Sequence, residues 1–315
     1  MPDNRQLTAR QIRYRRQQQR RRTQLRFFAL SFVAILLLAG VITAVIELPG
    51  KIKTAQTQSA SQSSTDSAST GENTAQITGA IGPELQAVSA YAAPTAAMLT
   101  MPANGRVDME YFSDALFIGD SLTQGFQMYA SGISSAHYAA YVGAGPKQMM
   151  EGTVINLNGD TVTAIDEILA AAPKKVYLLL GTNALSSLDD EALLKYYDDF
   201  MSYLAPKLPA DTVYYVQGIP PVTAEKSEGD TNYANTRIQA LDEQLSQLSY
   251  KHGWHYLNLY GALADENGNL RAEIVEGSDG VHLNGAGYEM WKEYLVTHTA
   301  YSSASPYIEG SPYIL

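Results

Sequence analysis

The sequence contains no cysteine among its 315 residues. This absence excludes disulfide bonds, zinc sites built on thiolates and a cysteine nucleophile. The chain is long enough to bury a sufficient core without disulfides, which are needed mainly by much smaller domains. The stability and the chemistry of this protein must therefore come from other residues.

Basic residues are scarce over most of the chain. Residues 1–53 carry 11 basic and 2 acidic residues, whereas residues 54–315 carry 11 basic and 30 acidic ones. Such an acidic region does not attract polyanions such as DNA, RNA or teichoic-acid-like polymers. We therefore expect no nucleic-acid partner, although the charge by itself identifies no substrate.

Long hydrophobic runs are also rare, and the longest lies near the N-terminus. Residues 27–46 form a 20-residue stretch without a charged side chain, and about 20 apolar residues are needed to cross a bilayer as a helix. This pattern predicts a transmembrane helix. A cleaved signal peptide, with Ala39-Gly40 as its cleavage site, is the alternative interpretation, but its apolar region would be shorter, about 7 to 15 residues.

Arginine is concentrated before this hydrophobic run. Nine arginines and one aspartate lie in residues 1–26, and an excess of basic residues marks the cytoplasmic side of a membrane span. We therefore expect a basic cytoplasmic tail and an extracellular C-terminal region. A basic arm could instead bind nucleic acid or anionic lipid headgroups, and only lipid contact is also compatible with the span. Exported proteins without cysteine are more common in Gram-positive bacteria than among secreted eukaryotic proteins, which favours a bacterial membrane protein.

The region after the span is low in apolar residues. Residues 47–105 are dominated by serine, threonine, alanine and glutamine, and such a segment buries too little apolar surface to offset its conformational entropy. We expect a flexible linker, and a coil of about 55 residues spans on the order of 40 Å on average. Residues 106–300 form the predicted folded domain. Residues 301–315 form a tail in which Ser-Pro-Tyr-Ile occurs twice, at 305–308 and 311–314.

Apolar runs and helical patterns alternate in the predicted domain. Near-continuous apolar runs are typical of strands buried on both faces, and five of them occur, at 115–118, 138–142, 176–180, 212–216 and 255–259. Helical patterns occur at 161–171, 189–204, 233–250 and 286–298. The alternation predicts a parallel α/β sheet with right-handed crossovers.

Three short segments in this domain carry side chains suited to catalysis. Ser121 lies in the segment 117–125, Asn183 ends Gly181-Thr182-Asn183, and Asp279-Gly280-Val281-His282 brings a carboxylate and an imidazole three residues apart. A weak alcohol nucleophile needs a base within hydrogen-bond reach and a third group that fixes the base's tautomer. Because the loops after parallel strands gather at one edge of the sheet, we expect these side chains to meet there. The pattern is typical of a serine hydrolase.

These segments resemble the signature segments of the GDSL, or SGNH, hydrolases. The resemblance covers roughly residues 112–298 and rests on Gly119-Asp120-Ser121-Leu122, a glycine after the second strand, Gly181-Thr182-Asn183 and Asp279-Gly280-Val281-His282. It implies a three-layer α/β/α domain with a parallel, flavodoxin-like five-stranded sheet. It also implies that Ser121 is the nucleophile, that His282 is the base and that Asp279 orients the base. No metal and no organic cofactor are expected.

The resemblance further implies an oxyanion hole with three donors. These are the backbone N–H of Ser121, the side-chain amide of Asn183 and a glycine N–H. For the glycine we prefer Gly145 to Gly143, because Gly145 lies nearer the start of the following segment. The family often has an acidic residue after the asparagine, whereas this chain has Ala184, so the local hydrogen bonding around Asn183 is expected to differ.

Several of these polar residues also have a structural interpretation. Ser121 could be a helix N-cap and Asn183 could cap the next segment, and Asp120 is expected to accept loop hydrogen bonds. The segment 265–269 resembles a calcium loop only faintly, since the full ligand order and the glutamate at the twelfth position are missing, and we expect a turn there. The remaining histidines lack a carboxylate at the family spacing and are expected at the surface or in packing: His137, His252, His255 and His298.

Topology and motifs together predict a membrane-tethered extracellular serine esterase. We expect it to remove a small acyl group, such as acetyl, from a carbohydrate or cell-wall glycan through an acyl-serine intermediate. An O-acyltransferase that uses the same three residues is one alternative, and a non-catalytic cell-wall-binding domain is another.

Overall fold

The computed structural model describes residues 93–130, 133, 135–156, 158–304 and 306–310. The chain divides into two units, Met1–Pro83 and Glu84–Leu315, and all described residues belong to the second. The predicted cytoplasmic tail and transmembrane helix, and most of the predicted linker, lie outside the described residues. Among the helices that are described, none has the length and apolar character needed to cross a bilayer.

The centre of the second unit is a five-stranded parallel sheet in the order β2-β1-β5-β6-β7. Its strands are β1 (Ala115–Gly119), β2 (His137–Ala140), β5 (Lys175–Leu179), β6 (Val213–Gln217) and β7 (His255–Leu257). All five predicted strands are confirmed, with ends shifted by at most two residues. Numbered in chain order, the sheet strands run 2-1-3-4-5, which is the flavodoxin-like order.

The two central strands are buried on both faces, as their apolar sequences require. Every residue of β1 and β5 is buried. Because successive side chains point to opposite faces, Ile118 and Leu178 contribute to one hydrophobic cluster, while Phe117 and Tyr177 contribute to the other. The Phe117 and Tyr177 rings stack with centroids 4.8 Å apart.

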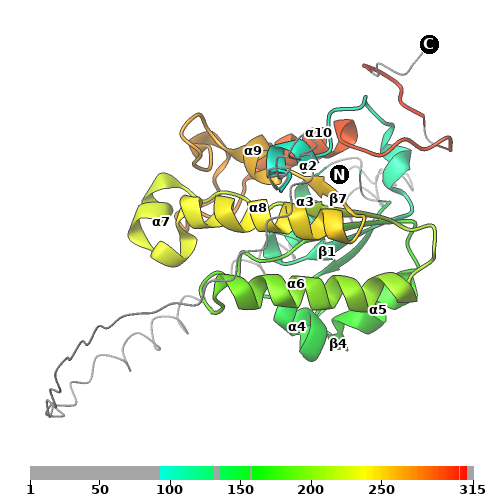
Figure 1. Ribbon diagram of the computed structural model, residues 1–315, viewed down its shortest axis with the longest axis horizontal. Coiled ribbons are helices and arrows are strands. Elements are labelled where there is room, and N and C mark those ends of the chain that lie inside the picture. Colours follow the sequence, from blue (N-terminus) through cyan, green and yellow to red (C-terminus); the bar gives the residue numbers. More distant parts are fainter. Residues whose placement is uncertain (1–92, 131–132, 134, 157, 305, 311–315) are drawn as a thin grey trace, which may run out of the picture. The chain divides into compact units, whose positions relative to one another are not determined.

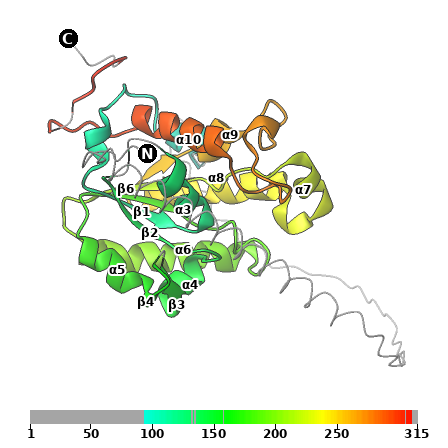
Figure 2. The same cartoon turned by 180° about the vertical axis from the view of Figure 1, so that it is seen from behind.

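Helices cover both faces of the sheet and make the fold three-layered (Figures 1 and 2). The first cluster is covered by α5 (Ala164–Ala171), α6 (Asp190–Leu204) and α8 (Asn235–Lys251). The second is covered by α3 (Ser121–Tyr129), α9 (Leu259–Leu263) and α10 (Gly285–Thr297). Shorter helices are α2 (Ala96–Leu99), α4 (Pro146–Glu151) and α7 (Ala224–Gly229).

The predicted helix over 161–171 is only partly correct. Its first three residues form β4 (Thr161–Thr163), which pairs antiparallel with β3 (Thr153–Ile155), and α5 begins at Ala164. The β-branched sequence Thr-Val-Thr favours a strand, since such side chains lose χ1 freedom in a helix. Val154 is buried in the first cluster, so pairing with β3 adds packing that a local helical pattern does not reveal.

The segment just before residue 106 also differs from its sequence interpretation. Its composition predicts part of the linker, yet its described residues contact the folded unit. The N–H of Ala96 lies 3.0 Å from both carboxylate oxygens of Glu243 on α8. Met101 is buried and its N–H donates to the carbonyl of Tyr256 at 2.8 Å. Buried contacts of this kind outweigh the low apolar content of the segment.

The C-terminal segment packs beside that entry point. Arg106 and Glu309 form an isolated antiparallel bridge, with the Arg106 N–H donating to the Glu309 carbonyl at 2.7 Å. Tyr307, from the first Ser-Pro-Tyr-Ile copy, is buried and donates to the Thr299 carbonyl at 2.9 Å. One copy of the repeat therefore anchors the chain, and the second copy lies outside the described residues.

Candidate active site

Ser121 is the first residue of α3, and only Asp120 separates it from the end of β1. The turn between strand and helix is tight, because a Cβ on Gly119 would lie 2.7 Å from the carbonyl oxygen of Leu179. Asp120 caps the helix by accepting from the Leu122 N–H at 2.9 Å. Unpaired N–H groups and the helix dipole at such a terminus favour developing negative charge.

The imidazole of His282 joins this serine to a carboxylate. Ser121 Oγ lies 2.9 Å from His282 Nε2, and His282 Nδ1 lies 2.5 Å from Asp279 Oδ2. With Nδ1–H donating to Asp279, the neutral ring presents the Nε2 lone pair to the Ser121 hydroxyl. The structure thus brings three predicted residues into one hydrogen-bonded chain, although Ser121 and His282 are 161 residues apart in the sequence.

A local turn orients the carboxylate of Asp279. Its Oδ1 accepts from the N–H groups of Val281 and His282 at 2.9 and 3.1 Å. Gly280 between them has φ +72°, in the left-handed region that glycine adopts without strain. Burial opposes the charge, but the His282 ring and these N–H groups outweigh it and lower the pKa of Asp279 to about 2.

His282 responds in the opposite direction. Burial disfavours the charged imidazolium, yet the hydrogen bond to Asp279 and the nearby charges of Asp279 and Asp120 more than compensate, so the pKa of His282 is raised. The base form is therefore present only above a pKa higher than the usual value near 6.5. Activity that needs a neutral His282 should rise as the pH increases through that pKa.

Asn183 lies in the turn that follows β5, facing Asp120. Its Nδ2 donates to Asp120 Oδ2 at 2.9 Å and lies 3.3 Å from the Ala144 carbonyl. Asp120 is 1 % exposed, and this burial raises its pKa to about 6 against the Leu122 and Asn183 hydrogen bonds and the charge of His282. The predicted loop bonds of Asp120 are therefore observed, and one of them ends on Asn183.

The glycine candidates have different surroundings. Gly145 is the N-cap of α4, and its N–H donates to Gln148 Oε1 at 3.1 Å. A Cβ on Gly145 would lie 3.3 Å from the Ala184 methyl group, so Gly145 neighbours the turn that carries Asn183. Gly143 is exposed, with φ +74° and open space around it. Ala184, which stands where the family often has an acidic residue, is buried.

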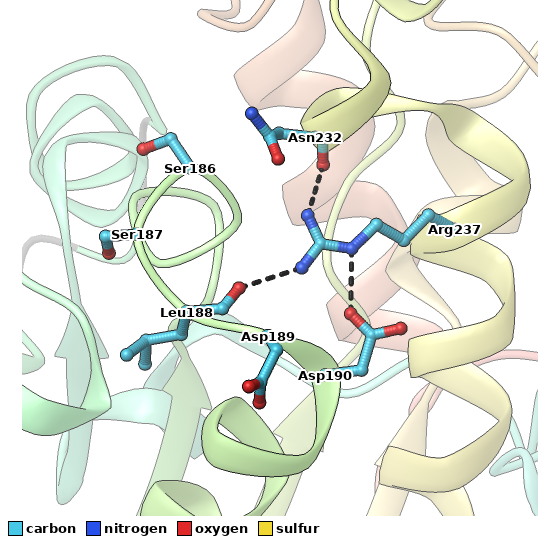
Figure 3. A pocket seen from close by; sticks show the side chains of 7 residues that line it. All are labelled: Ser186, Ser187, Leu188, Asp189, Asp190, Asn232 and Arg237. Atoms are coloured by element: carbon cyan, nitrogen blue, oxygen red, sulfur yellow. Dashed lines mark hydrogen bonds and ion pairs between the residues drawn. The ribbon is translucent and has the colours of Figure 1, made fainter. Parts of the chain in front are cut away.

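Arg237, which sequence patterns did not indicate, supports the loop that follows Asn183. Arg237 on α8 donates to the carbonyls of Leu185 and Leu188 at 2.7 and 2.9 Å, and to Asp190 Oδ1 at 2.7 Å. Figure 3 shows its guanidinium between Asn232 and the loop that follows Asn183. The Arg237 side chain borders a shallow pocket, which is lined by Ser186, Ser187, Leu188, Asp189, Asp190, Asn232 and Arg237. Since most Arg237 donors are satisfied within the protein, the residue ties α8 to the loop.

Other residues singled out in the sequence lie apart from this constellation. Asp265 accepts from the N–H groups of Asn267 and Asn269, both at 2.9 Å, which makes the predicted turn. His252 pairs with Asp198 at 2.6 Å, and the His298 ring stacks on Tyr294. Within the described ranges, no three histidine or acidic side chains are grouped closely enough to hold a metal ion.

Comparison with known proteins gives one family match. The family model described as GDSL-like Lipase/Acylhydrolase matches residues 117–290, which is more than half of the chain. The match includes all of the residues that form the hydrogen-bonded chain around Ser121. Comparison with curated proteins gives no match.

Similar solved structures have low sequence identity. A GDSL-like lipase from Bacteroides thetaiotaomicron is 15% identical, with 64% of this chain and 91% of that chain covered and a TM-score of 0.46. A Streptococcus pneumoniae protein described as a candidate platelet activating factor is 21% identical over 58% of this chain and 81% of that chain, with a TM-score of 0.47. An acetylxylan esterase from Geobacillus stearothermophilus is 11% identical over 60% and 94%, with a TM-score of 0.44.

Proposed function

We propose that this chain, which belongs to the GDSL-like lipase/acylhydrolase family, is a serine esterase. In this proposal Ser121 is the nucleophile, His282 is the base and Asp279 orients the base. The observation that carries the proposal is the hydrogen-bonded chain from Ser121 Oγ through both His282 nitrogens to Asp279. A nucleophile, a base and an orienting acid in contact are the required parts of such a site.

In the first half of the reaction, Ser121 Oγ attacks the ester carbonyl carbon while its proton passes to His282 Nε2. The imidazolium that forms is stabilised by Asp279, which stays ionised because its pKa is about 2. The tetrahedral intermediate then collapses, the bond to the alkoxy oxygen breaks, and His282 returns the proton to the leaving alcohol. An acyl-serine remains.

In the second half, a water molecule replaces the alcohol. His282 removes a proton from the water, the hydroxide oxygen bonds to the acyl carbon, and collapse releases the carboxylic acid. The proton returns to Ser121 Oγ, which restores the resting site. The full cycle consumes one ester and one water molecule, and it needs no other reactant.

The negative oxygen of both intermediates needs preorganised donors. The Ser121 N–H at the start of α3 and Asn183 Nδ2 are the first two donors in this proposal. Gly145 N–H is the third, and its present bond to Gln148 Oε1 would have to be exchanged for the oxyanion. Gly143 stays as the second choice for the third donor.

The location and substrate are part of the same proposal. The hydrophobic run at 27–46 and the arginines before it support a single-pass protein with its C-terminal domain outside the cell. That topology would place Ser121 within reach of a cell-wall glycan, and a small acyl ester such as an O-acetyl group on a carbohydrate is the substrate class we propose. Protease treatment of intact cells should digest the domain if this topology is correct.

The test of the reaction uses the full chain, purified in mild detergent because of the predicted membrane span. Hydrolysis of p-nitrophenyl acetate, butyrate and octanoate is compared with acetate release from O-acetylated xylo-oligosaccharide and O-acetylated peptidoglycan. Ser121→Ala is measured in parallel, since it removes the nucleophile but leaves background reaction from histidine and lysine. The proposal expects all ester cleavage above background to disappear with Ser121. Equal rates for both proteins on every ester would refute it.

A further inference from the structure

We propose that Asp120 is a positioning residue that fixes the side-chain amide of Asn183, so that Nδ2 and not Oδ1 is available to the oxyanion. The inference rests on the proposed function, because it assigns a task within that catalytic site. Asp120 itself touches no reacting atom in this proposal and acts through Asn183 and the start of α3.

Through its two carboxylate oxygens, Asp120 links the start of α3 to one proposed oxyanion donor, the Asn183 amide. Oδ1 accepts from the Leu122 N–H at 2.9 Å, in the first turn of the helix that begins at Ser121. Oδ2 accepts from Asn183 Nδ2 at 2.9 Å. An ionised carboxylate is the side chain that offers acceptors at both ends and no donor.

The Asn183 amide needs this constraint because its two ends have almost the same shape. The oxygen and nitrogen of a primary amide are distinguished only by their hydrogen-bond partners. If the amide turned by 180°, Oδ1 would face the developing negative charge and repel it. The bond to Asp120 is shorter than the 3.3 Å approach of Nδ2 to the Ala144 carbonyl, so Asp120 holds the nitrogen while the weaker contact can be exchanged.

Helix capping alone does not account for the burial of this carboxylate. Asp108 caps the short helix η1 (Met109–Phe112) by the same arrangement, accepting from the Glu110 N–H at 2.9 Å, yet it is exposed. Asp189 caps α6 and is also exposed. Asp120 is 1 % exposed, and burying a carboxylate is costly unless it is paired and hydrogen-bonded. Its additional contact is the Asn183 amide.

The first experiment compares Asp120→Asn, Asn183→Ala and the double variant in the full-length protein with p-nitrophenyl acetate. Asparagine is as good a cap as aspartate but has only one oxygen, so it cannot accept from both Leu122 and Asn183. We expect Asp120→Asn to lower kcat by about 10-fold to 10²-fold with KM within about twofold, as for loss of an interaction made in the transition state. In the Asn183→Ala background, the same change should cost less than about threefold, since residues that act as a unit are non-additive.

Asp108→Asn is the matched control, because it makes the same chemical change at a cap of the same geometry outside the catalytic site. It should leave kcat unchanged. A kcat for Asp120→Asn within twofold of the wild type would overturn the inference, as would an equal loss in the presence and absence of Asn183. If instead the wild-type protein and Ser121→Ala are equally inactive, the proposed function itself fails, so the two failures are distinguishable.

A second measurement, the pH dependence of kcat/KM, uses the wild-type protein and does not depend on whether an Asp120 variant folds. His282, Tyr288 and Tyr197 contribute charge or potential charge around Asp120, and both phenols stay neutral in acid because their pKa values are raised. Protonating His282 removes the base, and protonating Asp120, with its pKa of about 6, removes an acceptor. The slope of log kcat/KM against pH should therefore exceed 1 below about pH 6 in the wild type, and it should stay below 2 because protonated Asp120 costs only about 10-fold to 10²-fold in kcat. A slope of 1 down to pH 5 would contradict the inference.

Discussion

Two carboxylates, Asp279 and Asp120, lie near Ser121 and His282, and they have opposite electrostatic environments. The Asp279 side chain is 27% exposed and accepts from two backbone N–H groups and the His282 ring, which lower its pKa to about 2. Asp120 is 1 % exposed with fewer donors, and burial raises its pKa to about 6. The first is built to stay charged while a proton moves beside it. The second stays ionised at neutral pH at a cost, which is reasonable only where both of its oxygens must accept.

The largest expected effect comes from breaking the Asp279 side of this comparison. Asp279→Asn should lower kcat by about 10⁴-fold, as loss of the orienting acid does in serine hydrolases, because the ring would be held in the wrong tautomer. It should also lower the pKa of His282, since the hydrogen bond and charge that raise it are lost. Steady-state kinetics and NMR titration of His282 are the measurements. Asp265→Asn, which alters a similar turn carboxylate, should be neutral, and equal losses in both variants would show that the turn alone matters.

The next largest effect is expected on the other side, at Asn183. Asn183→Ala should reduce kcat by about 10² to 10³, the usual result of deleting one oxyanion donor, while the protein stays folded with a lower thermal midpoint, because Asp120 loses the Asn183 hydrogen bond. Because the interaction grows in the transition state, KM should change little. Full activity of the Asn183→Ala protein would show that Asn183 does not contribute to the oxyanion hole.

A smaller effect concerns stability and separates the two carboxylates by sign. The folded-state pKa of Asp120 is raised from 3.8 to about 6, so its contribution becomes less favourable as the pH rises from about 4 to about 6, by on the order of 2–3 kcal/mol. Asp279 is shifted downward to about 2, so its contribution is present above about pH 4 and is lost as the pH falls toward 2.

Urea unfolding of the wild type and Asp120→Asn between pH 4 and 7 measures this difference. The variant should gain stability relative to the wild type as the pH rises through that window. An unchanged difference in unfolding free energy across the window would mean that Asp120 is not held as a buried charge.

The smallest effect is expected where the Asn183 loop is supported from α8. Arg237→Lys keeps the charge but loses the planar set of donors, so carbonyls such as those of Leu185 and Leu188 would lose their partner. We expect a loss of about 1–3 kcal/mol in unfolding free energy, as for buried acceptors left unsatisfied, and a modest fall in kcat. Lys195→Arg, at an exposed ion pair with Asp199, is a control that should change neither.

The sequence predicts the sheet well because its evidence is local. Runs such as 176–180 are apolar throughout, and only a strand buried on both faces needs that composition. The Ser121 and Asn183 segments could likewise be placed at one sheet edge, because each follows an apolar run, whereas the Asp279–His282 segment begins about 20 residues after the last run and is placed there by the resemblance of its motif. Their roles in catalysis stay predictions, but the bond between Ser121 and His282 is present.

Other features depend on contacts that a pattern does not encode. Arg237 donates to backbone carbonyls about 50 residues away in the sequence. Every residue has a backbone carbonyl, so the residue types at those positions do not reveal such a contact. The docking of Ala96 on Glu243 has the same character, so composition alone places the end of the linker too far along the chain. The helical pattern at 161–171 includes β4 because the pairing of β4 with β3 is a tertiary contact.

The bridge between Arg106 and Glu309 also bears on the order in which the protein can mature. Backbone groups of Arg106 pair only with residues 308 and 309, so the segment leading into the central strand β1 is completed only after those residues have been synthesised. A chain that leaves the ribosome or crosses a membrane from its N-terminus would therefore travel with this junction open. Closure of this junction should therefore follow the formation of β1, and truncation before residue 306 should slow folding more than it alters the geometry around Ser121.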